Sequence, residues 1–130
     1  MRQVDTGRSG DYITKAENSL RMAEIAVKEE AYDNAVMSSV HSAINALDAL
    51  TTSCLGKRAS GSHTDVLGLV KGILDQKDHS DLAKQFVSLL SLKNASEYEP
   101  ELMKKGEAEA AVLRAKRILA KVKTALGEKR

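Results

Sequence analysis

Residues 32–55 read YDNAVMSSVHSAINALDALTTSCL, a long segment in which apolar or small side chains recur every three or four residues. That period places them on one face of an α-helix. The stripe consists of Val36, Val40, Ala43, Ile44, Leu47 and Leu50. We therefore predict a helix over about 32–55 that serves as the spine of the fold.

The same spacing, together with residues that typically start and end helices, predicts four more helices. They run from near Asp11 to Lys28, from His63 to about Asp75, from after Lys77 to before Pro100, and over roughly 107–126. Ser62 and Asp65 have the spacing of a capping box, and Asp78 or Ser80 is expected to cap the fourth helix. Short connections between helices of this length favour an all-α, antiparallel, up-and-down bundle of four to five helices.

The chain has 130 residues, of which 42% are hydrophobic, enough for one core. We predict a single domain over residues 11–127. The polar, glycine-containing residues 1–10 are expected to form a flexible N-terminal arm. No segment shows the alternating, β-branched pattern of strands, which also favours the all-α class.

The formal net charge of +2 neither favours nor excludes nucleic acid as a partner. The only cysteine, Cys54, cannot form an internal disulfide, and its apolar surroundings predict an inert, buried thiol. The sequence has no apolar leader and no run of about 20 apolar residues that could span a bilayer. We therefore expect a cytoplasmic protein without a membrane partner.

Conventional catalytic motifs are not found. His41, His63 and His79 lie on separate elements without a pair at metal-ligand spacing, so we expect no metal and no cofactor. The sequence also lacks a GxxxxGK[ST] phosphate loop, a nucleophile elbow and an HExxH motif. A conventional hydrolase or nucleotide triphosphatase is thus disfavoured.

Lys93 is the most unusual residue, because the apolar stripe formed by Leu82, Phe86, Leu89 and Leu90 runs through it. An ammonium withdrawn from water needs a carboxylate partner or becomes neutral, and both outcomes are typical of a site. Alternatively, its stem lies along apolar surface while the head reaches water.

His41, Asn45 and Asp48 follow at i, i+4 and i+7, which places them along one edge of the 32–55 helix. If this edge faces the fourth helix, Asp48 is a candidate counter-ion for Lys93. A histidine or lysine held there could act as an acid or base. The other interpretation is a polar edge in contact with water.

The loop from Lys57 to His63 combines two cations, Lys57 and Arg58, with glycines and the start of a helix. Free amides at a helix start and nearby cations attract phosphate or sulfate. The alternative is purely structural, with Ser62 capping a helix and the cations lying near helix carbonyls.

Lys93 is followed by Asn94 and, about one turn later, by Glu97 and Tyr98, and these four residues form the last candidate cluster. Tyr98 falls on a different side of the helix from Lys93. We expect it to be a core residue whose hydroxyl finds a hydrogen-bond partner.

The order of these segments resembles that of the HEPN domain family from about Tyr12 to Leu126. The most distinctive pieces are SHTDVLGL at 62–69 and LLSLKNASEY at 89–98. The resemblance implies a small helical bundle, often a homodimer. It further implies a link to RNA cleavage in toxin–antitoxin or defence systems, or to nucleotide binding beside a nucleotidyltransferase partner.

The ribonuclease branch of that family carries an arginine, followed four to six residues later by a histidine, near the end of the fourth helix. Here Lys93 stands near the arginine's place and Tyr98 near the histidine's. Arg58 and His63 have the R-x4-H spacing, but they lie before the third helix, and we interpret that match as accidental. The usual ribonuclease activity is therefore not expected.

These observations predict a bundle that binds RNA, a nucleotide or another phosphate ligand in a groove between the 32–55 helix and the fourth helix. Two alternatives remain. One is a homodimeric protein-interaction module that pairs with itself or with an antitoxin-like or nucleotidyltransferase partner. The other is a ribonuclease with an altered site.

Overall fold

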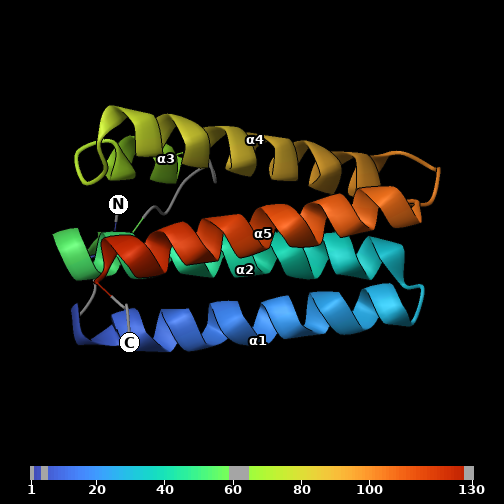
Figure 1. Ribbon diagram of the computed structural model, residues 1–130, viewed down its shortest axis with the longest axis horizontal. Helices are drawn as coiled ribbons and strands as arrows, with labels where there is room; N and C mark the ends of the chain where they lie inside the picture. The colour runs from blue at the N-terminus through green and yellow to red at the C-terminus, as the bar shows by residue number, and fades with distance from the viewer. Residues whose placement is uncertain (1, 4–5, 59–64, 128–130) are drawn as a thin grey trace.

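The computed structural model describes residues 2–3, 6–58 and 65–127, and this part of the chain contains five α-helices. They are α1 (Ser9–Lys28), α2 (Tyr32–Leu55), α3 (Asp65–Val70), α4 (Gln76–Tyr98) and α5 (Lys105–Ala125). The four long helices lie side by side and alternate in direction (Figure 1). The predicted all-α antiparallel bundle is thus confirmed.

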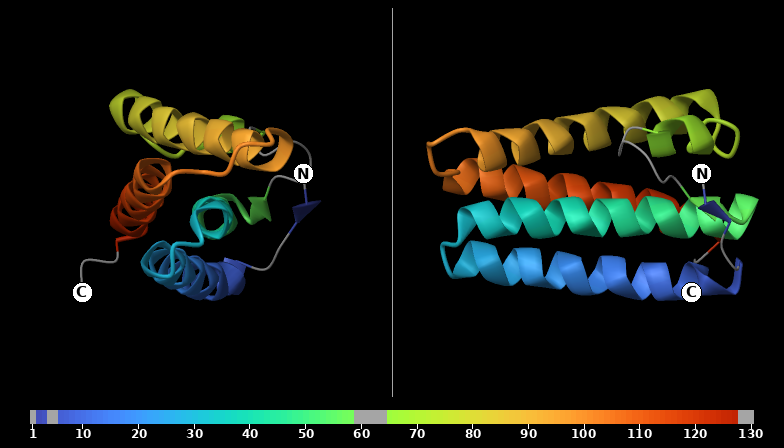
Figure 2. Two further views of the ribbon diagram at one scale, coloured as in Figure 1. Left: turned by 90° about the vertical axis from the view of Figure 1, so that its right-hand side faces the viewer. Right: turned by 180° about the vertical axis from the view of Figure 1, so that it is seen from behind.

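Helix α2 is the central element, because it packs against α1, α4 and α5. In the end-on view of Figure 2, α2 lies between α1 and α4, with α5 closing the side of the bundle. The largest fully buried apolar side chains come from α2, α4 and α5 together with Val70 of α3, and they are Phe86, Leu47, Leu50, Leu82, Leu89, Ile118, Val36, Val40, Val70 and Val122. The 32–55 segment therefore has the central position that its apolar spacing predicts.

Small residues let α1 and α2 approach closely. Ala16 and Ala23 of α1 are fully buried, as are Ser39 and Ala43 of α2. The buried Ser42 hydroxyl donates a 2.7 Å hydrogen bond to the backbone oxygen of Ala16 on the neighbouring helix. Because a buried hydroxyl without a partner is costly, this bond also fixes how the two helices sit along each other.

The predicted bounds of α2 agree with the structure, whereas those of α3 do not. Helix α3 ends at Val70, and the chain turns through Lys71 and Gly72 before α4. Asp75, expected to end the third helix, instead caps α4, since its Oδ1 accepts a 2.8 Å bond from the Asp78 amide. Asp78 and Ser80 were therefore the wrong candidates for this cap. Ser62, expected to cap the third helix, lies outside the described residues.

Part of the N-terminal arm pairs with the segment after α2. Strand β1 (Arg2–Gln3) and strand β2 (Lys57–Arg58) are antiparallel, with Arg2 opposite Arg58 in the backbone register. A short 3₁₀ helix, Thr6–Arg8, then leads into α1. Two-residue strands are too short to leave an alternating pattern in the sequence. The flexibility of residues 1–10 stays a prediction.

Cys54 was wrongly predicted to be buried: it is exposed. It belongs to the last turn of α2, which extends beyond the end of α5 in Figure 1, so α5 does not cover it there. Among the described helices, none is both long and apolar enough to span a membrane.

Asp33, in the first turn of α2, fixes the opposite end of the bundle. Its Oδ1 accepts a 2.5 Å hydrogen bond from the Ser96 hydroxyl of α4, and its Oδ2 accepts a 3.1 Å bond from the backbone amide of Met103. Met103 is buried just before α5 begins. One carboxylate therefore holds both helices of the α4–α5 hairpin against α2.

Candidate functional site

The predicted site residues lie at two ends of the bundle. Ser96 contacts Asp33, and α2 and α4 are antiparallel, so Lys93 lies about level with Val36. Asp48 follows Val36 by twelve residues, which at about 1.5 Å per residue is about 18 Å along the helix. The predicted Lys93–Asp48 ion pair is therefore wrong, and these residues do not form one groove.

Lys93 pairs with its own helix instead. Its Nζ donates a 3.1 Å hydrogen bond to Oε2 of Glu97, one turn later, and the two side chains are 19% and 31% exposed. Such an i,i+4 pair contributes only a few tenths of a kcal/mol. Tyr98, predicted to be a core residue, is 77% exposed because α4 ends there and the chain turns away toward α5.

Asp48 is the buried carboxylate of the structure, and its partner is Arg58 of β2. The Arg58 Nη1 and Asp48 Oδ2 atoms are 3.6 Å apart, with Arg58 28% and Asp48 10% exposed. Burial raises the pKa of the Asp48 carboxyl from 3.8 to about 6, although the charge and hydrogen bonding of Arg58 lower it. The arginine therefore offsets only part of the cost of burying this charge.

Two residues that the sequence analysis did not select complete this end of the molecule. The Lys15 Nζ lies 5.6 Å from the centre of the Tyr12 ring, and the Arg58 guanidinium carbon lies 5.8 Å from the same centre. A hollow of about 520 Å³ beside them is lined by Arg8, Asp11, Tyr12, Thr14 and Lys15. The i,i+3 spacing of Tyr12 and Lys15 was the available signal, and it gives no indication of Arg58.

The remaining polar candidates are separate from this cluster. His41 is exposed, and the Asn45 amide donates a 2.9 Å bond to the His41 backbone oxygen. The ring of His79 bonds the backbone oxygen of Leu67 and so links α4 to α3. His63 lies outside the described residues. No group of three or more potential metal ligands occurs within residues 2–3, 6–58 and 65–127.

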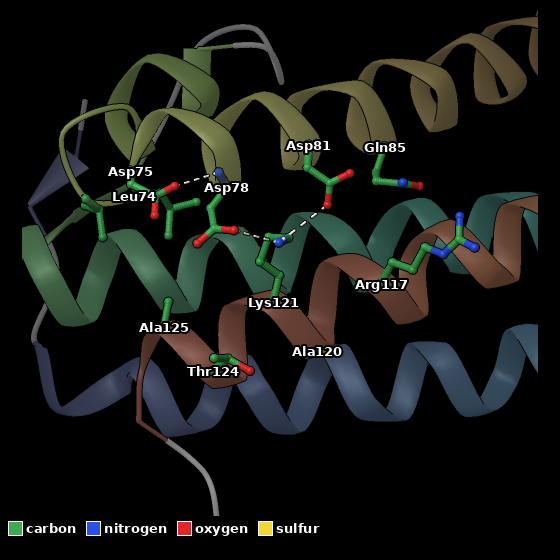
Figure 3. Close-up of a pocket in the computed structure, with 11 residues that line it drawn as sticks. Leu74, Asp75, Asp78, Asp81, Gln85, Arg117, Ala120, Lys121, Thr124 and Ala125 are labelled. Atoms are coloured by element: carbon green, nitrogen blue, oxygen red, sulfur yellow. Dashed lines mark hydrogen bonds and ion pairs between the residues drawn. The ribbon is translucent and has the colours of Figure 1, made fainter.

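A groove of about 680 Å³ between α4 and α5 also escaped the sequence analysis (Figure 3). Lys121 of α5 reaches across it, with its Nζ 3.0 Å from Asp78 and 3.4 Å from Asp81. The hydrogen bond that Lys121 donates to Asp78 raises the pKa of its ammonium. Lys121 therefore stays charged and joins α5 to the start of α4.

The comparisons with known proteins agree with this architecture. The HEPN domain matches residues 9–125, nearly the whole chain. The chain belongs to the HEPN family. A similar solved structure is the crystal structure of TT1696 from Thermus thermophilus, with a TM-score of 0.69 and 21% identity. The match covers 91% of this chain and 98% of that one, and at this identity it shows the fold alone. The comparison with curated proteins gave no match.

In this HEPN chain the carboxyl group whose pKa burial raises to about 6, Asp48, does not lie at the end of α4. It lies where the last part of α2 meets β2 and the start of α1. We name the residues Tyr12, Lys15 and Arg58, together with Lys57 as the neighbour of Arg58 in β2, the cationic surface, and Asp48 is buried beneath Arg58.

Replacing Asp48 by asparagine should stabilise the fold at neutral pH. The raised pKa means that the folded state binds the Asp48 proton more tightly than the unfolded state, so this contribution to stability is lost as pH rises from about 4 to about 6. The free energy of urea unfolding of Asp48→Asn minus that of the natural chain should grow over this range and level off above it. The plateau should reach at most about 3 kcal/mol, corresponding to about two pKa units.

Asp81→Asn is the matched control, because Asp81 is half exposed and has the same charge. The free energy of urea unfolding of Asp81→Asn minus that of the natural chain should not rise between about pH 4 and pH 6. If the Asp48→Asn difference instead fell as pH rose, the Asp48 pKa would have to be lowered by Arg58 rather than raised by burial.

Proposed function

We propose that this HEPN protein binds a phosphate-containing ligand, RNA or a nucleotide, at the cationic surface. The observation that carries this proposal is the approach of two cations, from Lys15 and Arg58, to the single Tyr12 ring. They come from α1 and β2, which are far apart in sequence. The fold therefore brings positive charges from two distant segments to one aromatic ring.

An anion would lower the energy of this arrangement. Lys15, Lys57 and Arg58 carry three positive charges, while Asp48 supplies one negative charge and, among the described residues, forms an ion pair with Arg58 alone. Arg8 and Asp11 of the adjacent hollow pair with each other at 2.9 Å, so their charges balance. Among the described residues, no carboxylate forms an ion pair with Lys15 or Lys57. Like charges repel one another, and a phosphate between them replaces repulsion by attraction.

A chain of phosphodiesters fits this surface as well as a single phosphate does. The cations and the adjacent hollow form an open surface rather than an enclosed pocket, as a nucleic-acid backbone requires. Tyr12 adds the aromatic residue that often accompanies cations in such surfaces. RNA and nucleotides thus share the chemistry that this surface recognises.

Lys15→Ala and Lys57→Ala should each weaken the binding of a short single-stranded RNA. Both substitutions leave the Asp48–Arg58 pair in place. Binding weakens as salt rises, so log K falls with log salt concentration. Each lost phosphate contact should make this negative slope shallower by about 0.7. Fluorescence titration at several low salt concentrations measures this slope, with a nucleotide as a second ligand.

Lys84→Ala is the control, since Lys84 is exposed on α4 and the substitution changes the net charge equally. It should bind like the natural chain. No saturable binding by the natural chain at low salt, or equal losses in all three variants, would remove a ligand site at the cationic surface.

We further propose that the bound RNA is not cleaved in the manner of the ribonuclease branch. Metal-independent cleavage needs a base for the 2′-hydroxyl proton and cations at the phosphorane. At the end of α4, Lys93 is engaged by Glu97, and Tyr98 points away from the bundle core. RNA recovered after incubation should keep its full length on a denaturing gel. Shortening that His41→Ala or Lys93→Ala abolishes would show a ribonuclease with an altered site.

A second candidate function is self-association through α1 and α5. An apolar hollow of about 270 Å³ lies between these helices, and Leu113 at its edge is 46% exposed. Its lining includes two acids and two bases, Glu24, Glu109, Lys28 and Lys116. Glu24 and Lys116 pair with each other across α1 and α5 at 2.9 Å. In a two-fold dimer Glu109 of one copy can face Lys28 of the other, so this face complements itself.

Leu113→Glu should therefore convert a dimer to a monomer in sedimentation velocity at micromolar concentration. Val87→Glu, at a similarly exposed position on α4, should leave the dimer intact. A monomeric natural chain would exclude the proposal. An antitoxin-like or nucleotidyltransferase partner, which family membership suggests, would compete with the second copy if it used the same face.

A further inference from the structure

We propose that Asp48 competes with the ligand for Arg58, so that the cationic surface binds its ligand together with a proton. The inference rests on the proposed phosphate-binding function and adds its regulation. In this arrangement Asp48 is a positioning residue: it touches Arg58 and acts on the ligand through it. Its protonation releases the guanidinium for the phosphate.

The geometry around Asp48 shows why the competition arises. The carboxylate is almost completely withdrawn from water, and the nearest described cation is 3.6 Å away, too long for a strong charge-assisted hydrogen bond. Neighbouring Thr52 is fully buried, and its hydroxyl has no hydrogen-bond partner, so it does not replace the missing bond. Asp48 is therefore ionised only at a cost, which Arg58 reduces.

Arg58 has two partners for its guanidinium, the Asp48 carboxylate and the Tyr12 ring. Its Nη1 faces Asp48, its guanidinium also contacts the Tyr12 ring, and its Nε is buried without a hydrogen-bond partner. A phosphate oxygen offers a guanidinium shorter and stronger hydrogen bonds than this distant carboxylate does. When the ligand engages Arg58, Asp48 loses its only described counter-ion and takes up a proton.

The other charged groups around Asp48 and the Tyr12 ring are two lysines and the Arg8–Asp11 pair, whose opposite charges lie 2.9 Å apart. Lys15 from α1 also contacts the Tyr12 ring, and Lys57 precedes Arg58 in β2. On α2 itself, Asn45 and Thr52 occupy the turns before and after Asp48 and carry no charge. The anionic ligand screens the two lysines, which removes positive potential that would keep Asp48 ionised.

The binding energy of the ligand is then linked to pH. Burial already raises the pKa of Asp48 to about 6 without a ligand, so about nine in ten molecules are ionised at pH 7 and about one in ten at pH 5. Ligand binding should raise this pKa further. Affinity should therefore increase as pH falls, because the protonated form presents Arg58 without a competitor.

The test is a titration with a short oligouridylate that has hydroxyl ends, between about pH 5 and pH 8. Its phosphodiesters do not titrate in this range, unlike a terminal phosphate, whose second pKa is about 6. The natural chain should bind at least about tenfold more tightly at pH 5 than at pH 8. Asp48→Asn should bind tightly at both values, with a change below about twofold.

Asp81→Asn is the matched control, since it makes the same charge change at a half-exposed position away from the cationic surface. It should keep the pH profile of the natural chain. The histidines are present in every variant, so their contribution cancels in the comparison.

A second measurement needs no substitution. Calorimetric titration of the natural chain at pH 7 in two buffers of different ionisation enthalpy gives the number of protons taken up, and uptake approaching about one is expected. Binding without proton uptake, or equal pH profiles for the natural chain and Asp48→Asn, would overturn the inference and leave the proposed function standing. Absence of RNA binding by both chains at every pH would remove the proposed function, and this inference with it.

Discussion

The structure depends on α2 being enclosed by three other helices. Small residues on its α1-facing side permit close packing, and the Ser42 hydroxyl bonds the backbone of Ala16 there. Larger side chains such as Leu47 and Leu50 fill the rest of the core. Because close-packed interiors allow little displacement, polar residues on α2 occupy fixed positions. The depth of Asp48 follows from this constraint.

Burying the Asp48 carboxylate costs free energy when it is ionised, and its partner Arg58 offsets only part of that cost. Asp48 is too deep for water and too far from Arg58 for a strong hydrogen bond, so its pKa remains raised. The arginine in turn is shared with Tyr12. Paired β1 and β2 keep the segment carrying Arg58 beside the end of α2. Weakly satisfied charges of this kind are more common at functional sites than in purely structural positions.

The sequence predicted the long helices well, because apolar periodicity over about twenty residues is a strong local signal. The family was suggested by the resemblance of the segments at 62–69 and 89–98. The bounds of α2 agree, and Lys93 does meet a carboxylate, although from Glu97 rather than Asp48. Which charges meet across helices depends on their register along one another, and that register was not evident from spacing. Tyr12 and Lys15 were missed because Arg58, which contacts the same Tyr12 ring, lies more than forty positions away in the sequence. Cys54 and Tyr98 are exposed because each lies at the end of a helix, where neighbouring helices do not cover it. The sequence pattern does not show where the ends of packed helices lie relative to one another.

Asp33 has a topological consequence. The chain itself links the α1–α2 and α4–α5 hairpins at the end where α3 lies, and the Asp33 carboxylate links them at the opposite end. The bundle is therefore clasped at both ends, covalently at one and by two hydrogen bonds at the other. Any opening of the two hairpins must pivot on the α3 end, so the cationic surface lies near the hinge while the tip of α4 travels farthest.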